Sequence, residues 1–163
     1  MDLILLRHGK AEDQNPQGDF FRELTEKGRD QSRRAAHLIK SAGKLPEVIL
    51  TSPLIRARQT ADEFSRTAEM PGAITQSWLA CGMHPEIALK ELAGFPEFKR
   101  IMIVGHEPDF SHLLQWILGV GDGRIQVKKG AIACIQIFPP SRHGKLKFLI
   151  PPKLVDEAEP EWR

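Results

Sequence analysis

Three short segments of this sequence hold side chains that could bind and transfer a phosphoryl group. They are Arg7-His8-Gly9, Thr51-Ser52-Pro53-Leu54-Ile55-Arg56 and Gly105-His106-Glu107-Pro108. Arginine presents a planar fork of donors that matches phosphate oxygens, and it stays charged at any working pH. Histidine can act as a nucleophile or as an acid or base near neutral pH. If these segments converge, they bring together two arginines and two histidines, a set of side chains suited to phosphoryl transfer.

Each segment directly follows a predicted strand. Leu3–Leu6, Val48–Leu50 and Ile101–Val104 are continuous apolar runs, which are typical of strands covered on both faces. Further strands are predicted over Ala131–Ile137 and Leu146–Ile150, with a weaker one around Ile74–Leu79.

Helical patterns lie between these runs. Small residues from Gly28 to Ala36 share one face of a helix predicted over Thr25–Ile39, which favours close packing on a sheet. Three more helices are expected: one capped by Ser52 with Pro53 at its first position, one from His84-Pro85 to Leu92, and one from Pro108 to a stop at Gly119.

Strands that alternate with helices predict an α/β fold, with three α/β/α layers and a mostly parallel central sheet. We expect a single domain over residues 1–155 and a polar tail over residues 156–163. In such folds ligands gather at the carboxyl ends of the strands, where the strand order reverses. The three polar segments should therefore meet at one edge of the sheet.

Arg56 has an unusual expected position. It falls in or just after the first turn of its helix, where a cation meets the positive end of the helix dipole. That placement costs ~0.3–1 kcal/mol unless an anion lies nearby. The free N–H groups of the same helix end suit such an anion. The alternative is a solvated arginine that points away from any site.

The motifs resemble those of the histidine phosphatase superfamily, also called phosphoglycerate mutase-like. The matching residues are Leu6-Arg7-His8-Gly9, Ser52-Pro53 with Arg56-Ala57 and Gln59-Thr60-Ala61, and Gly105-His106. Arg22-Glu23-Leu24-Thr25-Glu26-Lys27-Gly28 and Lys129-Gly130-Ala131 are similar to segments of the small bacterial phosphohistidine phosphatases within that superfamily. The resemblance covers about residues 1–150 and implies the phosphoglycerate mutase-like fold.

The resemblance also implies roles for individual residues. His8 would be the nucleophile that becomes phosphorylated, with Arg7, Arg56 and His106 around the phosphoryl oxygens. Gly9 would allow close backbone approach where the strand turns and would belong to the phosphate-binding residues. Arg22 would border the phosphate pocket, although a plain surface role is an open alternative for it. No metal or other cofactor is expected, because the arginines and a protonated His106 would supply the positive charge.

The proton donor of larger relatives has no clear counterpart here. Glu86, Glu107 and His84 are candidates, each with an ordinary helix-end or surface role as the alternative. An alkoxide needs a proton as it leaves, whereas a protonated phosphoimidazole leaves as neutral imidazole. A site without a dedicated acid is therefore suited to phosphohistidine on a partner protein.

Two other functions stay open: a small-molecule phosphomonoesterase of the same superfamily, and a non-catalytic phosphate-binding module. A mutase is less expected, because no long insertions that would hold a second phosphorylated substrate are evident. Cys81 and Cys134 lack the loop of a cysteine phosphatase, and no paired aspartates follow a strand. P-loop and dinucleotide glycine patterns are absent too.

Composition restricts the class of partner. The formal net charge is +2, and no run of five or more basic residues occurs, so a nucleic-acid partner is not expected. No apolar stretch approaches the ~20 residues that cross a bilayer. The first residues lack a signal-peptide layout. We expect a cytoplasmic monomer that acts on a phosphohistidine-bearing protein or a small phosphate ester.

Overall fold

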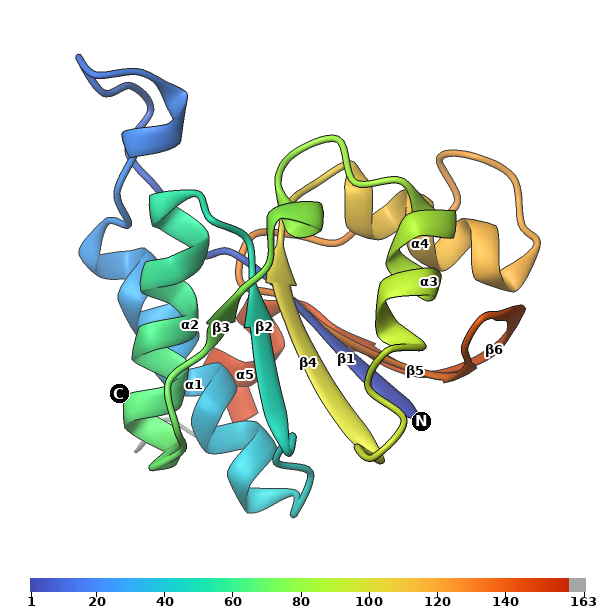
Figure 1. Ribbon diagram of the computed structural model, residues 1–163. Coiled ribbons are helices and arrows are strands. Elements are labelled where there is room, and N and C mark those ends of the chain that lie inside the picture. Colours follow the sequence, from blue (N-terminus) through green and yellow to red (C-terminus); the bar gives the residue numbers. More distant parts are fainter. Residues whose placement is uncertain (159–163) are drawn as a thin grey trace.

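A six-stranded sheet runs through the centre of the molecule, in the order β3-β2-β4-β1-β5-β6 (Figure 1). The computed structural model describes residues 1–158. The strands are β1 (Asp2–Arg7), β2 (Val48–Thr51), β3 (Ile74–Thr75), β4 (Arg100–Gly105), β5 (Ile132–Phe138) and β6 (Ser141–Ile150). The first four run parallel to one another, while β5 and β6 are antiparallel to their neighbours. The predicted mostly parallel sheet is confirmed.

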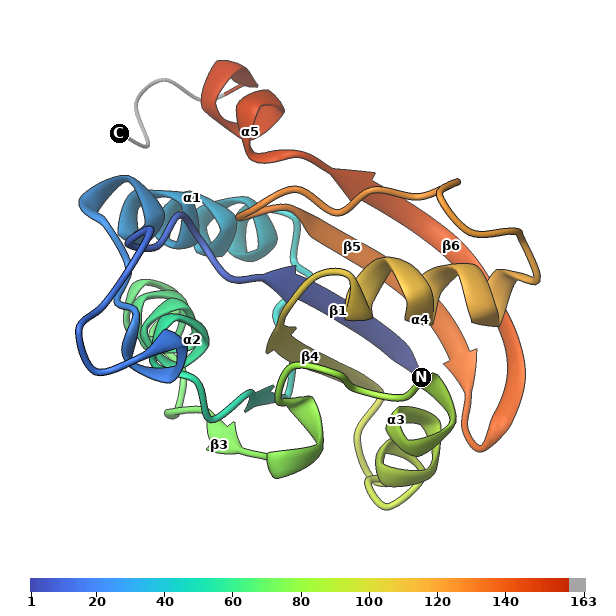
Figure 2. The same ribbon diagram turned by 90° about the horizontal axis from the view of Figure 1, so that it is seen from above.

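Helices cover both faces of this sheet, as the view from above shows (Figure 2). α1 (Glu26–Ser41), α2 (Ile55–Ala68) and α5 (Pro152–Ala158) lie on one face, and α3 (Pro85–Leu92) and α4 (Asp109–Leu118) lie on the other. Short 3₁₀ turns occur at Asp19–Phe21 and Ser77–Leu79. The three-layer architecture is therefore confirmed.

The central strand β1 shows how the sequence produces these layers. Leu3 and Leu5 belong to the core cluster beneath α3 and α4, whereas Ile4 and Leu6 belong to the cluster beneath α1 and α2. Successive side chains of a strand point to opposite faces, so a continuous apolar run serves two cores at once. All four side chains are fully buried, and each contributes roughly 1.5–3 kcal/mol relative to an exposed position.

Three expected elements are wrong in their bounds. β6 begins at Ser141, whereas this strand was expected to begin at Leu146. The second helix begins at Ile55 with Leu54 as its N-cap, so Ser52 does not cap it and Pro53 lies outside it. The Ser52 hydroxyl instead accepts the Leu54 N–H at 3.3 Å in the preceding turn. The weak strand is limited to Ile74–Thr75, because the chain then turns at Ser77–Leu79 and buries Leu79.

The carboxyl-terminal boundary also differs from the expectation. The polar tail was expected from Asp156, but α5 continues to Ala158. Asp156 forms an ion pair with Arg34 of α1, which holds this helix against the rest of the fold. Residues 159–163 lie outside the described part of the chain.

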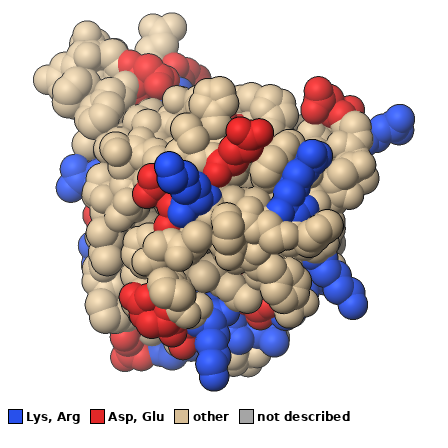
Figure 3. Space-filling view, turned by 45° about the vertical axis from the view of Figure 1, so that its right-hand side comes forward, with Lys and Arg blue, Asp and Glu red and all other residues tan. Residues whose placement is uncertain are grey.

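Surface charge on the face seen in Figure 3 is mixed in sign. Lys and Arg side chains lie in separate positions among Asp and Glu, without a broad area of either sign. This distribution agrees with the net charge of +2. Within residues 1–158, no helix has the length and apolar character to span a membrane.

Candidate active site

Three neighbouring parallel strands place the polar segments together. β4 lies between β1 and β2, with Arg7 opposite Gly105 and Thr51 opposite Val104. The chain leaves all three strands at the same edge of the sheet. The residues that follow, including His8, Ser52 and His106, are buried there.

The backbone around His8 fixes the orientation of its imidazole. The ring Nδ1 lies 2.8 Å from the carbonyl oxygen of Gly9. A carbonyl only accepts hydrogen bonds, so Nδ1 carries the proton and the lone pair lies on Nε2. Arg56 directs its Nε toward this Nε2 at 3.4 Å. The nitrogen next to the arginine is therefore the nucleophilic one.

Burial keeps His8 neutral. Its pKa is lowered to about 3, chiefly by burial and further by the positive charges of Arg56 and Arg7 and by His106, while the Gly9 carbonyl opposes the shift. Only the unprotonated imidazole can attack phosphorus. At neutral pH essentially all of His8 is in that form.

His106 lies on the other side of the site. Its ring centroid is 5.3 Å from that of His8, and its Nε2 lies 2.7 Å from the Ser52 hydroxyl. Burial first, and then the charges of Arg56 and Arg7, lower its pKa to about 4. Desolvation outweighs the opposing effect of the Asp19 charge and favours the neutral ring of His106. The protonated form expected during phosphoryl transfer stays a prediction.

Two buried side-chain nitrogens at the site have no partner within residues 1–158. They are Nδ1 of His106 and Nε of Arg7. Arg7 is anchored by another nitrogen, NH1, which donates to the Val127 carbonyl at 2.9 Å. Buried polar groups are nearly always hydrogen-bonded, so the unpaired N–H of Arg7 beside a nucleophile suits an anionic ligand.

Gly9 lies where two backbone segments approach each other closely. A Cβ at Gly9 would lie 2.4 Å from the carbonyl oxygen of Gly28, so the glycine lets α1 approach the segment after β1. The Gly9 N–H donates to Thr60 Oγ1 at 3.2 Å and is not free for phosphate. Gly9 contributes to the site through its carbonyl, which orients His8.

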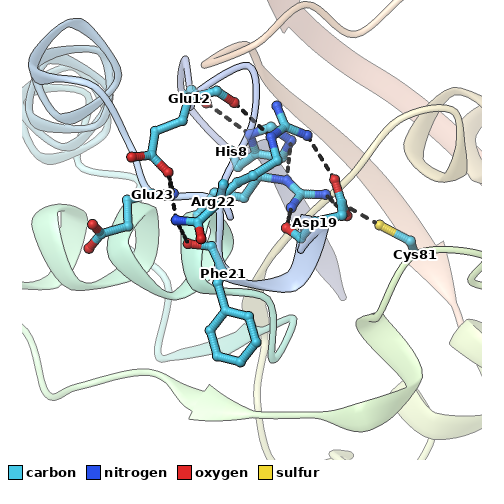
Figure 4. A network of polar contacts seen from close by, with 10 residues as sticks. His8, Glu12, Asp19, Phe21, Arg22, Glu23 and Cys81 are labelled. Atoms are coloured by element: carbon cyan, nitrogen blue, oxygen red, sulfur yellow. Dashed lines mark hydrogen bonds and ion pairs between the residues drawn. The ribbon is translucent and has the colours of Figure 1, made fainter. Parts of the chain in front are cut away.

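The segment between β1 and α1 brings an aspartate into the site (Figure 4). Arg56 donates from NH1 to the Asp19 carbonyl at 2.9 Å and from NH2 to the Asp19 carboxylate at 3.2 Å. Arg22 binds the other carboxylate oxygen of Asp19 at 2.9 Å. Arg22 therefore reaches the site through Asp19, while its Nε donates to the Glu12 carbonyl at 2.6 Å.

Comparison with known proteins identifies the family. A model of the histidine phosphatase superfamily (branch 1) matches residues 3–79. An uncharacterised protein of Picosynechococcus is 31% identical over 152 residues, which cover 81% of this chain and 82% of that protein. The chain belongs to the histidine phosphatase superfamily. The resemblance inferred from the motifs is confirmed, and membership supports a phosphatase activity.

Other members of the superfamily match over different shares of their length. A 2,3-bisphosphoglycerate-dependent phosphoglycerate mutase of Corynebacterium kroppenstedtii is 47% identical over 64 residues, which cover 37% of this chain but only 25% of the mutase. The similarity in fold extends over a much larger part of the chain than this match in sequence. The protein histidine phosphatase SixA in complex with tungstate superposes with a TM-score of 0.84 at 24% identity, over 95% of this chain and 99% of that chain. The alpha-ribazole phosphatase of Shigella flexneri gives 0.74 at 19% identity, over 91% and 96%.

The three candidate proton donors lie in different surroundings. The Glu107 carboxylate accepts the Ser111 N–H at 2.7 Å at the start of α4, and its charge also acts on Arg7. Glu86 is exposed in the first turn of α3. His84 is exposed at the N-cap of α3 and lines a surface pocket with Cys81, whose sulfur lies 3.7 Å from Arg56 NH2. None of the three has a recorded hydrogen bond to His8 or His106 within residues 1–158.

The sequence interpretation missed three residues of this site. Asp19 had no signal beyond its place three residues before Arg22. Thr60 belongs to the matched motif, but its two hydrogen bonds to neighbouring backbone are visible only in three dimensions. Ser52 was interpreted as a helix cap, whereas its hydroxyl bonds to His106. Among the described residues, no cluster of three or more His, Cys, Asp or Glu could hold a metal ion.

Proposed function

We propose that this protein is a phosphohistidine phosphatase that transfers the phosphoryl group of a partner protein to Nε2 of His8 and then to water. The observation that carries the proposal is the state of His8. It is a neutral imidazole with its Nδ1 proton held by Gly9 and its Nε2 lone pair beside Arg56. The likeness of the fold to a protein histidine phosphatase agrees with this substrate class.

In the first step the Nε2 lone pair of His8 attacks phosphorus. The bond from phosphorus to the substrate nitrogen breaks, and its electron pair returns to that nitrogen. A substrate imidazole that carries a proton on its distal nitrogen then departs as neutral imidazole. Arg7, Arg56 and His106 would bind the phosphoryl oxygens and stabilise charge as it develops.

The second step uses the same hydrogen bond to Gly9. Phosphorylation of Nε2 while Nδ1 keeps its proton leaves a positive charge on the His8 ring, and the Gly9 carbonyl stabilises this charge. Water attacks phosphorus, the P–N bond breaks, and its electron pair returns to Nε2. Dihydrogen phosphate leaves and neutral His8 is regenerated, so neither step requires a separate general acid.

A substrate panel tests the proposal. Hydrolysis of a phosphohistidine-bearing protein should exceed that of sugar, nucleotide and alkyl phosphates in kcat/KM by orders of magnitude. Faster cleavage of the esters would assign the site to a small-molecule phosphomonoesterase instead. Binding of phosphate without turnover of any member of the panel would leave a phosphate-binding module.

A further inference from the structure

Asp19 occupies two donors of Arg56 that a phosphoryl group could also use. The side chain of Arg56 is 5% exposed, and Asp19 takes an N–H from each of its two terminal nitrogens. The remaining side of the fork faces His8 and Cys81. An arginine binds phosphate oxygens through these same N–H groups. The Nε side of Arg56 can therefore meet a phosphoryl group on His8, whereas a group that takes the N–H groups held by Asp19 must displace this residue.

The surroundings of Asp19 allow that displacement. Its side chain is 63% exposed, on a 3₁₀ turn without buried residues. The base of the segment is fixed independently, because the Glu12 carboxylate accepts the Glu23 N–H at 3.0 Å and Arg22 bonds the Glu12 carbonyl. The carboxylate can leave Arg56 and stay close to the site on Arg22.

The charge of the site then depends on the substrate. Three guanidinium groups, those of Arg7, Arg22 and Arg56, are balanced against two carboxylates, Asp19 and Glu107, while both histidines are neutral. The site thus holds one net positive charge, and a phosphoryl dianion brings two negative ones. An ester whose leaving group is uncharged leaves one negative charge in excess, with the displaced Asp19 carboxylate nearby. A substrate with its own positive charge restores balance.

We propose that Asp19 is a specificity-determining residue that selects substrates whose leaving group carries a protonated nitrogen, above all phosphorylated imidazole, over phosphate esters with an uncharged leaving group. This inference rests on the proposed function. The displaced carboxylate accepts a hydrogen bond from the distal N–H of the substrate imidazole, as the aspartate of a catalytic triad does from its imidazolium. That N–H keeps its proton while the P–N bond breaks and its electron pair returns to the departing nitrogen.

Substitution of Asp19 separates this role from a structural one. The experiment measures kcat/KM of wild type and D19N with phosphoimidazole and with p-nitrophenyl phosphate, whose leaving group has no proton to donate. D19N should lower the ratio of the two kcat/KM values at least tenfold. It should also strengthen inhibition by inorganic phosphate, because the competing carboxylate is gone. D19E, which keeps the charge, should restore part of the ratio.

Asp13→Asn is the matched control, because it removes the same charge from an exposed position of the same segment. It should leave the ratio unchanged. Provided that the wild type hydrolyses phosphoimidazole, either of two results would overturn the inference. One is an equal change in kcat/KM for both substrates in D19N, and the other is the same loss of the ratio in D13N. A wild type that does not hydrolyse phosphoimidazole would instead refute the proposed function.

Discussion

His8 owes its reactivity to its neighbours. An exposed histidine is about half protonated near pH 6.5 and has no preferred tautomer that would aim one nitrogen at a substrate. Here burial removes the proton, and the Gly9 carbonyl decides which nitrogen keeps the remaining one. Sequence identified His8, Arg56 and His106 as candidates for one site but could not give their protonation, because desolvation depends on packing from elements distant in the chain.

The pH dependence of activity should reflect this state. With His8 lowered to a pKa of about 3 and His106 to about 4, neither group titrates in the free enzyme between pH 5 and 7. The pH profile of kcat/KM reports the free enzyme. After correction for the ionisation of the substrate, kcat/KM should not depend on pH over this range. A fall toward pH 5 with a midpoint near 6.5 would contradict a buried neutral nucleophile.

Thr60 should matter for both stability and catalysis. Its hydroxyl donates to the Arg56 carbonyl at 2.7 Å and accepts the Gly9 N–H, linking the two sides of the site. Thr60→Val keeps the shape but leaves a buried N–H unpaired, at a cost of about 1–3 kcal/mol. We expect a lower free energy of unfolding and a lower kcat. Ser65→Ala on the same helix is the control, because its buried hydroxyl has no partner within the described residues, and it should change little.

At the scale of elements, the sequence predicted the strands and helices that position the site. Continuous apolar runs correctly indicated β1, β2 and β4, because strands buried on both faces have no other common pattern. The start of α2 was wrong because Ser52 fits a cap by residue type, while its hydroxyl bonds to His106 in the fold. The segment that carries Asp19 has no periodicity, so its contact with Arg56 could not be predicted.

The contact between α1 and the segment after β1 depends on two glycines. A Cβ at Gly28 would lie 2.1 Å from the Lys10 carbonyl oxygen, so α1 would have to move away. Alanine normally stabilises a helix interior by about 1 kcal/mol relative to glycine. We expect Gly28→Ala to do the opposite, with a lower melting temperature and a loss of turnover. Gly121→Ala, where the added Cβ meets nothing within 4 Å, should leave both unchanged.

At the scale of the whole molecule, the burial of neutral histidines links stability to pH. In the unfolded chain His8 and His106 titrate near 6.5, whereas in the fold their pKa values are about 3 and about 4. Between these values the unfolded state binds protons that the folded state does not. The free energy of unfolding therefore falls as pH drops from about 6.5 toward 4.

Urea denaturation between pH 7 and 4.5 measures this dependence. The wild type should lose stability with falling pH. His106→Asn should lose less over the same interval, because one of the two histidines that bind a proton only in the unfolded state is gone. His143→Asn replaces an exposed histidine and should keep the slope of the wild type. Equal slopes in all three proteins would mean that His106 is not buried in its neutral form.

The most direct test of the account is the position of the phosphoryl group in the enzyme itself. Rapid quenching of the wild type with a phosphohistidine substrate, followed by mass spectrometry and phosphorus NMR, should show one acid-labile phosphate on Nε2 of His8. His8→Ala should show neither the phosphoenzyme nor turnover. Phosphate on another residue, or undiminished activity in His8→Ala, would contradict the assignment of the nucleophile.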